Sequence, residues 1–276
     1  MGFRATTRRN FHGQVAVVTG AGSGIGRALA RRLAADGARL AISDVDIEGL
    51  AQTAELIGAD VRTDRLDVTD RVAVLAYAES VAAEFSVVNL VINNAGVAHG
   101  GALLGMSFAD IERVIDVDFW GVVNGSKAFL PHLIASGRGT LVNISSLFGL
   151  VPMPSQSAYV AAKYAVRGFT ETLRMEMLVG RFPVRVTCVH PGGVATSIAR
   201  SGTVNAGEPI EGHSDYFDQK LARTSADEAA ATILHGAARG RPRVLVGNDA
   251  KLAHLLNTAS NRAWQRVVAA GYRRRA

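Results

Sequence analysis

The sequence has few of the features that would place the protein outside the cytoplasm. It has one cysteine, Cys188, which excludes an internal disulfide and is typical of a reducing compartment. No apolar run approaches the roughly 20 residues that a membrane-spanning helix needs. The first nine residues include several arginines, but no apolar stretch follows these charges. The segment is therefore not expected to be a secretory signal. We therefore expect a cytoplasmic protein with Cys188 buried in a strand.

Acidic residues are missing from both ends of the chain, and this determines how its positive charge is interpreted. A formal net charge of +6 would suggest a nucleic-acid partner. Eight arginines, however, lie in the two ends, and without them the charge is −2: Arg4, Arg8, Arg9, Arg262, Arg266, Arg273, Arg274 and Arg275. The body is mildly acidic, so we expect no nucleic-acid partner. No cluster has metal-ligand spacing, so we expect no metal site.

Short runs rich in Val, Ile and Leu alternate with longer amphipathic stretches along the chain. This alternation is typical of βαβ units around a parallel sheet. Seven strands are expected, at 15–18, 39–43, 61–66, 89–93, 139–144, 184–189 and 243–246. Helices are expected at 25–35 and from a Ser225/Glu228 capping box to about 238. The pattern predicts an α/β fold: a doubly wound, Rossmann-type, mainly parallel seven-stranded sheet flanked by helices, in a single domain.

No repeat, low-complexity linker or break in composition indicates a second domain. We divide the chain into a basic tail at 1–13, a dinucleotide-binding catalytic domain at 14–247 and an amphipathic helical extension with a basic tail at 248–276. Residues 196–224 are expected to form a long surface excursion. The extension is expected to pack on the body, on a neighbouring subunit or at a pocket mouth, and the alternative is a membrane-surface helix whose arginines meet anionic lipid.

A glycine-rich turn, T-G-A-G-S-G-I-G at 19–26, follows the first strand and precedes the first helix. Glycine allows a sharp turn and a close approach to a pyrophosphate, and the helix N-terminus supplies free N–H groups. The spacing is T-G-x-x-x-G-x-G and not G-x-G-x-x-G. The residues expected to bind the phosphates are Gly20, Ser23, Gly24, Ile25 and Gly26.

An acid, Asp44, stands at the end of the second expected strand. In this architecture an acid there accepts hydrogen bonds from the adenosine ribose and repels a 2′-phosphate. Neither Ser23 nor Val45 supplies a cation for that phosphate. The sequence therefore favours NAD over NADP, although a plain turn-forming aspartate is the alternative.

Tyr159 and Lys163 are four residues apart, so on a helix both project from one face. A fixed lysine charge lowers the pKa of a nearby phenol and suits it to proton exchange at neutral pH. Ser146 follows the strand at 139–144, where its hydroxyl can reach into the crevice at the sheet edge and hold a substrate oxygen. A turn residue is the alternative for Ser146.

Six motifs agree in order and spacing, and together they resemble the short-chain dehydrogenase/reductase family from about residue 13 to 247. They are the glycine turn, Asp67-Val68, Asn93-Asn94-Ala95-Gly96, the Ser146–Tyr159 separation, the Tyr159/Lys163 pair and the segment 191–196. The resemblance implies a tyrosine acid/base, a lysine that also binds the nicotinamide ribose, and a serine that orients the carbonyl. It also implies cofactor contacts from Asp67, Val68, Asn93, Ala95, Gly96, Tyr159, Lys163, Pro191, Gly192, Val194 and Thr196.

One position departs from the family pattern. The segment V-N-x-x-G has become Val117-Asp118-Phe119-Trp120-Gly121, so Asp118 replaces an asparagine that anchors a water leading to the lysine. Asn124 lies about 240° further round the helix and cannot substitute. An ionised Asp118 would favour charged Lys163 while partly cancelling that charge at Tyr159.

The expected reaction is hydride transfer between NAD(H) and a secondary alcohol or ketone. The candidate pocket residues are mostly apolar and suggest a hydrophobic substrate: His99, Phe148, Met153, Gln156, Ile198, Tyr216 and Phe217. His99 and His190 are interpreted as ordinary loop histidines. The alternative function is a non-catalytic NAD-binding scaffold or sensor of the same fold. The resemblance also implies a homotetramer or homodimer.

Overall fold

A computed structural model describes residues 11–58, 60–196, 202–206 and 224–273. Its central sheet has seven strands in the order β11-β7-β6-β4-β1-β2-β3, and every pairing is parallel. The strands are β1 Val15–Thr19, β2 Arg39–Asp44, β3 Arg62–Arg65, β4 Leu90–Asn93, β6 Gly139–Ile144, β7 Val184–Pro191 and β11 Arg243–Val246. The seven-stranded parallel sheet expected from the sequence is confirmed, and each strand lies within two residues of its expected bounds.

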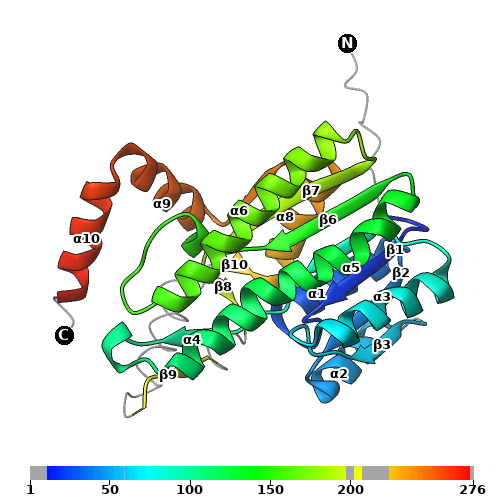
Figure 1. Ribbon diagram of the computed structural model, residues 1–276, viewed down its shortest axis with the longest axis horizontal. Helices are drawn as coiled ribbons and strands as arrows, with labels where there is room; N and C mark the ends of the chain where they lie inside the picture. Colours follow the sequence, from blue (N-terminus) through cyan, green and yellow to red (C-terminus); the bar gives the residue numbers. More distant parts are fainter. Residues whose placement is uncertain (1–10, 59, 197–201, 207–223, 274–276) are drawn as a thin grey trace.

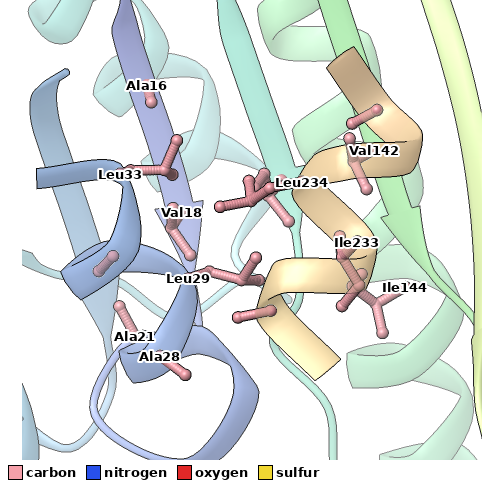
Figure 2. Packing of buried hydrophobic residues seen from close by; sticks show 14 of the residues in the cluster. Ala16, Val18, Ala21, Ala28, Leu29, Leu33, Val142, Ile144, Ile233 and Leu234 are labelled. Atoms are coloured by element: carbon pink, nitrogen blue, oxygen red, sulfur yellow. The ribbon is translucent and has the colours of Figure 1, made fainter. Parts of the chain in front are cut away.

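Helices cover both faces of this sheet (Figure 1). One face carries α1 Gly24–Ala35, α2 Ile47–Ile57 and α8 Ala226–Ala238, and the other carries α3 Arg71–Phe85, α5 Gly121–Ala135 and α6 Ser157–Val179. Figure 2 shows Leu29 of α1 pointing toward Leu234 of α8, and Ile233 of α8 beside Ile144 of β6. Parallel strands are buried on both sides, which explains their continuous apolar runs. The Ser225/Glu228 capping box opens α8 as expected.

Shorter elements surround the carboxyl ends of the strands. Two small parallel pairs join β5 His99–Gly100 to β9 Thr203–Val204, and β8 Val194–Ala195 to β10 Thr224–Ser225. Helix α4 Phe108–Ile115 continues through a π-helical turn, η2 Asp116–Trp120, into α5. Single 3₁₀ turns lie at η1 Leu103–Gly105 and η3 Leu147–Gly149. The expected surface excursion is therefore tied to the body at β9.

The two ends of the described chain differ from the sequence interpretation in detail. Phe11, assigned to the tail, is buried in the core beside α1, so the folded body begins before residue 14. The C-terminal extension consists of two helices, α9 Asn248–Ala259 and α10 Asn261–Arg273, which extend away from the sheet (Figure 1). Within the described ranges, no helix is both long and apolar enough to span a membrane.

Candidate active site

The turn after β1 has a backbone that only glycine accommodates at several positions. Gly20 and Gly24 have φ of +66° and +52°, in the left-handed region that disfavours side chains. A Cβ at Gly26 would overlap the carbonyl oxygen of Gly20. Helix α1 begins at Gly24, so its first N–H groups lie at the carboxyl edge of the sheet. This geometry fits a pyrophosphate.

Side chains from other segments brace this turn, and the sequence interpretation did not single them out. The amide of Asn94 donates to the carbonyl oxygens of Thr19 and Gly20, each at 3.0 Å. The Thr19 hydroxyl accepts from the backbone N–H groups of Asn94 (3.0 Å) and Ala95 (3.2 Å). Arg27 donates to the carbonyl oxygens of Gly22 and Gly49. The repeated asparagine in N-N-A-G was the signal for the first of these contacts.

Asp44 ends β2 directly beside the turn. Its Oδ2 accepts from the backbone N–H of Gly22 at 2.8 Å, and its Oδ1 accepts from that of Asp46 at 3.0 Å. Val45, the next residue, is apolar and 54% exposed. The residues present fit an adenosine ribose.

The cofactor candidates on the neighbouring segments lie at the same edge of the sheet, where β4 ends at Asn93. Asp67 Oδ1 accepts from Thr69, and the carbonyl oxygen of Val68 accepts from the Asn124 amide at 3.0 Å. Asn124 thus holds the loop at Asp67 and Val68, a contact that the sequence did not reveal. The side chain of Asn93, a residue expected to line the cofactor cleft, is buried and donates to Asn143 (2.8 Å), so its amide also supports the sheet.

The segment 191–196 closes the opposite side of the turn. A Cβ at Gly24 would lie 3.1 Å from the Cβ of Thr196, so the two segments touch. Val194 is buried in β8. The backbone N–H of Gly192 donates to Val246 O at 2.9 Å. Pro191 ends β7, so this stretch is fixed by the last two strands of the sheet.

Ser146, Tyr159 and Lys163 come together where β6 ends and α6 begins. Lys163 Nζ lies 5.4 Å from the centroid of the Tyr159 ring and 3.4 Å from Ile144 O. Ser146 caps η3, accepting from Phe148 N at 3.1 Å, and the Phe148 ring packs edge-on against Tyr159 with centroids 6.2 Å apart. The lysine is only 3% exposed, so its ammonium acts in a low-dielectric setting.

Asp118 faces this lysine from the π-helical turn. Its Oδ2 lies 3.5 Å from Lys163 Nζ, and its Oδ1 accepts from the backbone N–H of Val97 at 2.8 Å. The side chain is fully buried. A Cβ at Gly96 would lie 3.0 Å from Oδ1, so the glycine leaves room for this carboxylate. Where the family pattern has an amide, this chain has a buried ion pair.

Burial and charge shift the pKa values of Tyr159, Lys163 and Asp118. The shift at Tyr159 differs from the lowered pKa expected from the sequence. Burial raises the pKa of Tyr159 above its ordinary value, and although Lys163 opposes the rise, Asp118 adds to it. Burial alone would lower the pKa of Lys163, but Asp118 and Tyr159 raise it, so the lysine stays charged. Burial also raises the pKa of Asp118. Lys163 therefore limits the rise in the pKa of Tyr159 but does not reverse it.

The two histidines interpreted as ordinary loop residues lie instead in strands, His99 in β5 and His190 in β7, where both are buried and specifically bonded. The Nδ1–H of His190 donates to Ser146 O at 2.9 Å, which fixes the tautomer. Burial lowers the pKa of His190 to about 4, so the ring is neutral. His99 lies between the side chains of Thr203 (2.7 Å) and Asn205 (3.1 Å), where it fastens β9 to the body.

The other pocket candidates divide into two groups. Phe148, Met153 and Gln156 lie on the segment that joins β6 to α6. Ile198, Tyr216 and Phe217 lie outside the described residues. Among the residues that are described, no group of His, Cys, Asp or Glu could hold a metal ion.

Comparison with known proteins gives one consistent family. The short chain dehydrogenase family model matches residues 14–206. SadH of Mycobacterium tuberculosis, named as an oxidoreductase, is 58% identical over 95% of this chain and 96% of its own length. A 3-alpha-(or 20-beta)-hydroxysteroid dehydrogenase of the same species is 34% identical over 72% of this chain and 79% of its own.

A solved structure extends the likeness to the fold. The short-chain dehydrogenase/reductase from Burkholderia phymatum, crystallised in complex with NAD, has a TM-score of 0.85 and 31% identity. The match covers 92% of this chain and 96% of that one. The chain therefore belongs to the short-chain dehydrogenase/reductase family of oxidoreductases.

Proposed function

We propose that the protein transfers a hydride between NAD(H) and a secondary alcohol or ketone, with Tyr159 as the acid/base. One observation carries the proposal: a partly buried phenol lies beside a charged, buried ammonium, at the sheet edge where the glycine turn and Asp44 also lie. Parallel α/β sheets bind their ligands at this edge. A scaffold that only bound NAD would have no need for Ser146, Tyr159 and Lys163 together.

The chain's residues would divide the chemistry among them. When bound, NAD would accept the hydride in alcohol oxidation. Ser146 orients the substrate oxygen, and Tyr159, as the phenolate, takes the hydroxyl proton and becomes the neutral phenol. Lys163 stabilises the negative charge of that phenolate and binds the nicotinamide ribose. Asp118 keeps Lys163 charged and fixes its position. The catalytic set is thus Ser146, Tyr159, Lys163 and Asp118.

Cofactor binding is assigned to the residues around the turn. The phosphates would lie over Gly20–Gly26, and Asp44 would bind the adenosine ribose. The adenine would lie near Asp67 and Val68, and the carboxamide near Val194 and Thr196. The exposed apolar Val45 and the carboxylate of Asp44 support NAD in preference to NADP.

A hydrophobic substrate is the finer part of the proposal. Phe148 packs on Tyr159, and Met153 lies further along the same segment. The similarity to a hydroxysteroid dehydrogenase supports a bulky apolar alcohol. Screening short, branched and polycyclic secondary alcohols with NAD, and reading the absorbance of NADH, tests the function. NADH formation with at least one apolar alcohol is expected. NAD binding without turnover of any alcohol or ketone, in either direction, would favour the scaffold.

We also propose that the protein is a homodimer or homotetramer. Large apolar side chains are exposed on α4, η2 and α6, namely Phe108, Trp120, Tyr164 and Met175. Such exposure on neighbouring helices is typical of an interface. Sedimentation at micromolar concentration should give a mass above that of the monomer, and a monomer alone would contradict the proposal.

A further inference from the structure

The two C-terminal helices contact the segment between the candidate catalytic residues in a regular pattern. Asn257 donates to the carbonyl oxygen of Leu150 (3.1 Å), Trp264 Nε1 to that of Pro152 (3.1 Å), and the Tyr272 hydroxyl to that of Pro154 (3.3 Å). Successive donors on the helices thus bind every second carbonyl of the segment. The match in order and spacing indicates that the helices fit this segment specifically.

The segment 150–155 is otherwise anchored at its two ends. At its start, Leu150 and Val151 are buried, and their backbone N–H groups donate to Leu147 O. At its end, the carbonyl oxygen of Ser155 accepts from the backbone N–H of Gly101 at 2.9 Å. Between these ends, Pro152 and Pro154 lack the N–H groups that strand pairing would need. Since the segment joins η3 to α6, its path determines what lies between Phe148 and Tyr159.

The first turn of α9 contacts the segment 191–196, which is assigned to the cofactor. Asp249, in the first turn of α9, accepts through Oδ2 from the backbone N–H of Gly193 at 2.6 Å. A side chain at Gly192 or at Gly247 would overlap this carboxylate. The helices therefore connect the segment 191–196 with the segment 150–155, and contact both edges of the candidate site.

We propose that α9 and α10 are a substrate-positioning arm, with Trp264 as its central residue. The arm holds the segment 150–155 in the path that a bulky apolar alcohol or ketone requires on its way to Tyr159. This inference rests on the proposed function and assigns its substrate side to residues 248–273. Trp264 is a positioning residue, because it acts through the carbonyl of Pro152 and not on the reacting atoms. The outer face of α10, with Arg262 and Arg266, is exposed and is not required.

Hydrogen–deuterium exchange tests the contact without depending on turnover. Trp264→Phe keeps an aromatic ring but removes the Nε1–H, and Arg262→Ala alters the outer face as a matched control. We expect faster exchange in a peptide spanning 147–157 in Trp264→Phe, and wild-type exchange in Arg262→Ala. Unchanged exchange in Trp264→Phe, or equal changes in both variants, would overturn the proposal. The proposed function could fail in the alcohol screen while this result stood.

Kinetics tests the consequence for the substrate. For the bulkiest alcohol that the wild type oxidises, Trp264→Phe should raise KM by roughly 2- to 10-fold, the range of one net hydrogen bond. Its kcat and NAD affinity should remain at wild-type values. A chain truncated after Ala259, which lacks both Trp264 and Tyr272, should raise KM further for that alcohol than for a short one. A fall in kcat with unchanged KM, or an equal rise for short and bulky alcohols, would contradict a positioning role.

Discussion

The cofactor half of the site and the chemical half are built by different means. Around β1, β2 and β4, the turn at 20–26 is shaped by glycine backbone and held by neutral hydrogen bonds that Asn94 donates, including one to the Thr19 hydroxyl. Around β6 and α6, the decisive contact is a buried ion pair, Lys163 with Asp118, beside a partly buried phenol. The first region thus fixes the shape of the backbone, and the second fixes the charge on Lys163.

The difference determines how each half responds to substitution. Backbone shape depends on local sterics, so a change in the cofactor half should alter affinity without altering the proton chemistry. A buried charge is stabilised by its partner, so removing either member leaves the other uncompensated. Variants of the chemical half should therefore affect both turnover and folding.

The largest effect is expected for Lys163→Met. The substitution leaves the buried Asp118 without its cation, which for such a pair costs about 3–5 kcal/mol of unfolding free energy. Turnover should fall by roughly 10²-fold or more, and NAD affinity should fall with it. Urea unfolding at pH 7 and NAD titration measure the two effects. The double variant Lys163→Met/Asp118→Asn should regain most of the stability, and failure to do so would mean that the ion pair is not the cause.

A second effect on stability is expected from His190, whose imidazole is kept neutral by burial. Its pKa of about 4 in the folded state lies below the ordinary 6.5, so unfolding takes up a proton as the pH falls. The contribution is complete above pH 6.5 and is lost between pH 6.5 and about 4, by at most about 3 kcal/mol. His190→Gln, which keeps a donor for Ser146 O, should lose less stability than wild type between pH 7 and pH 4.5. Equal losses by urea unfolding would refute this.

The cofactor half is tested by changing its charge alone. Asp44→Ala combined with Val45→Arg removes a repelling carboxylate and adds a phosphate partner. The ratio of kcat/KM with NAD to that with NADP should fall by about 10- to 100-fold, the scale of one charged hydrogen bond. Asp46→Asn, which preserves the α2 cap, is the control and should leave the ratio unchanged. Equal affinities of the wild type for NAD and NADP would contradict the assignment of Asp44 to the adenosine ribose.

The smallest effect on turnover is expected for Asp118→Asn, which restores the amide of the family pattern. Because the substitution removes the counter-ion of the buried Lys163, some loss of stability should accompany it. Since the Asp118 charge raises the pKa of Tyr159, its removal should move the acidic limb of kcat/KM for alcohol oxidation to lower pH. At the optimal pH, kcat should stay within about tenfold of wild type, below the loss expected for an acid/base group. An alkaline shift, or none, would show that the carboxylate does not act on the phenol.

Sequence and structure agree best where the signal is local. Strand runs of Val, Ile and Leu located β6 to the residue, and the glycine spacing located the turn before α1. These features depend on neighbours in the chain, so periodicity and residue type suffice.

The differences arise where contacts join distant segments. The motif that places Asn93 at the cofactor cleft does not reveal that its amide donates to Asn143, 50 residues away. The direction of the Tyr159 shift depended on burial, which the spacing of Tyr159 and Lys163 does not report. Trp264 fitted a helical period, but its contact with Pro152 spans 112 residues.

The most direct test of the account compares turnover and NAD binding in Tyr159→Phe. The phenol supplies only a proton to the reaction, whereas the cofactor is assigned chiefly to the glycine turn, Asp44 and Lys163. The account predicts that kcat on a good alcohol falls by roughly 10²-fold or more, while the Kd for NAD by calorimetry stays within about twofold. A variant that kept more than about a tenth of wild-type kcat, or that lost NAD affinity in proportion to turnover, would contradict it.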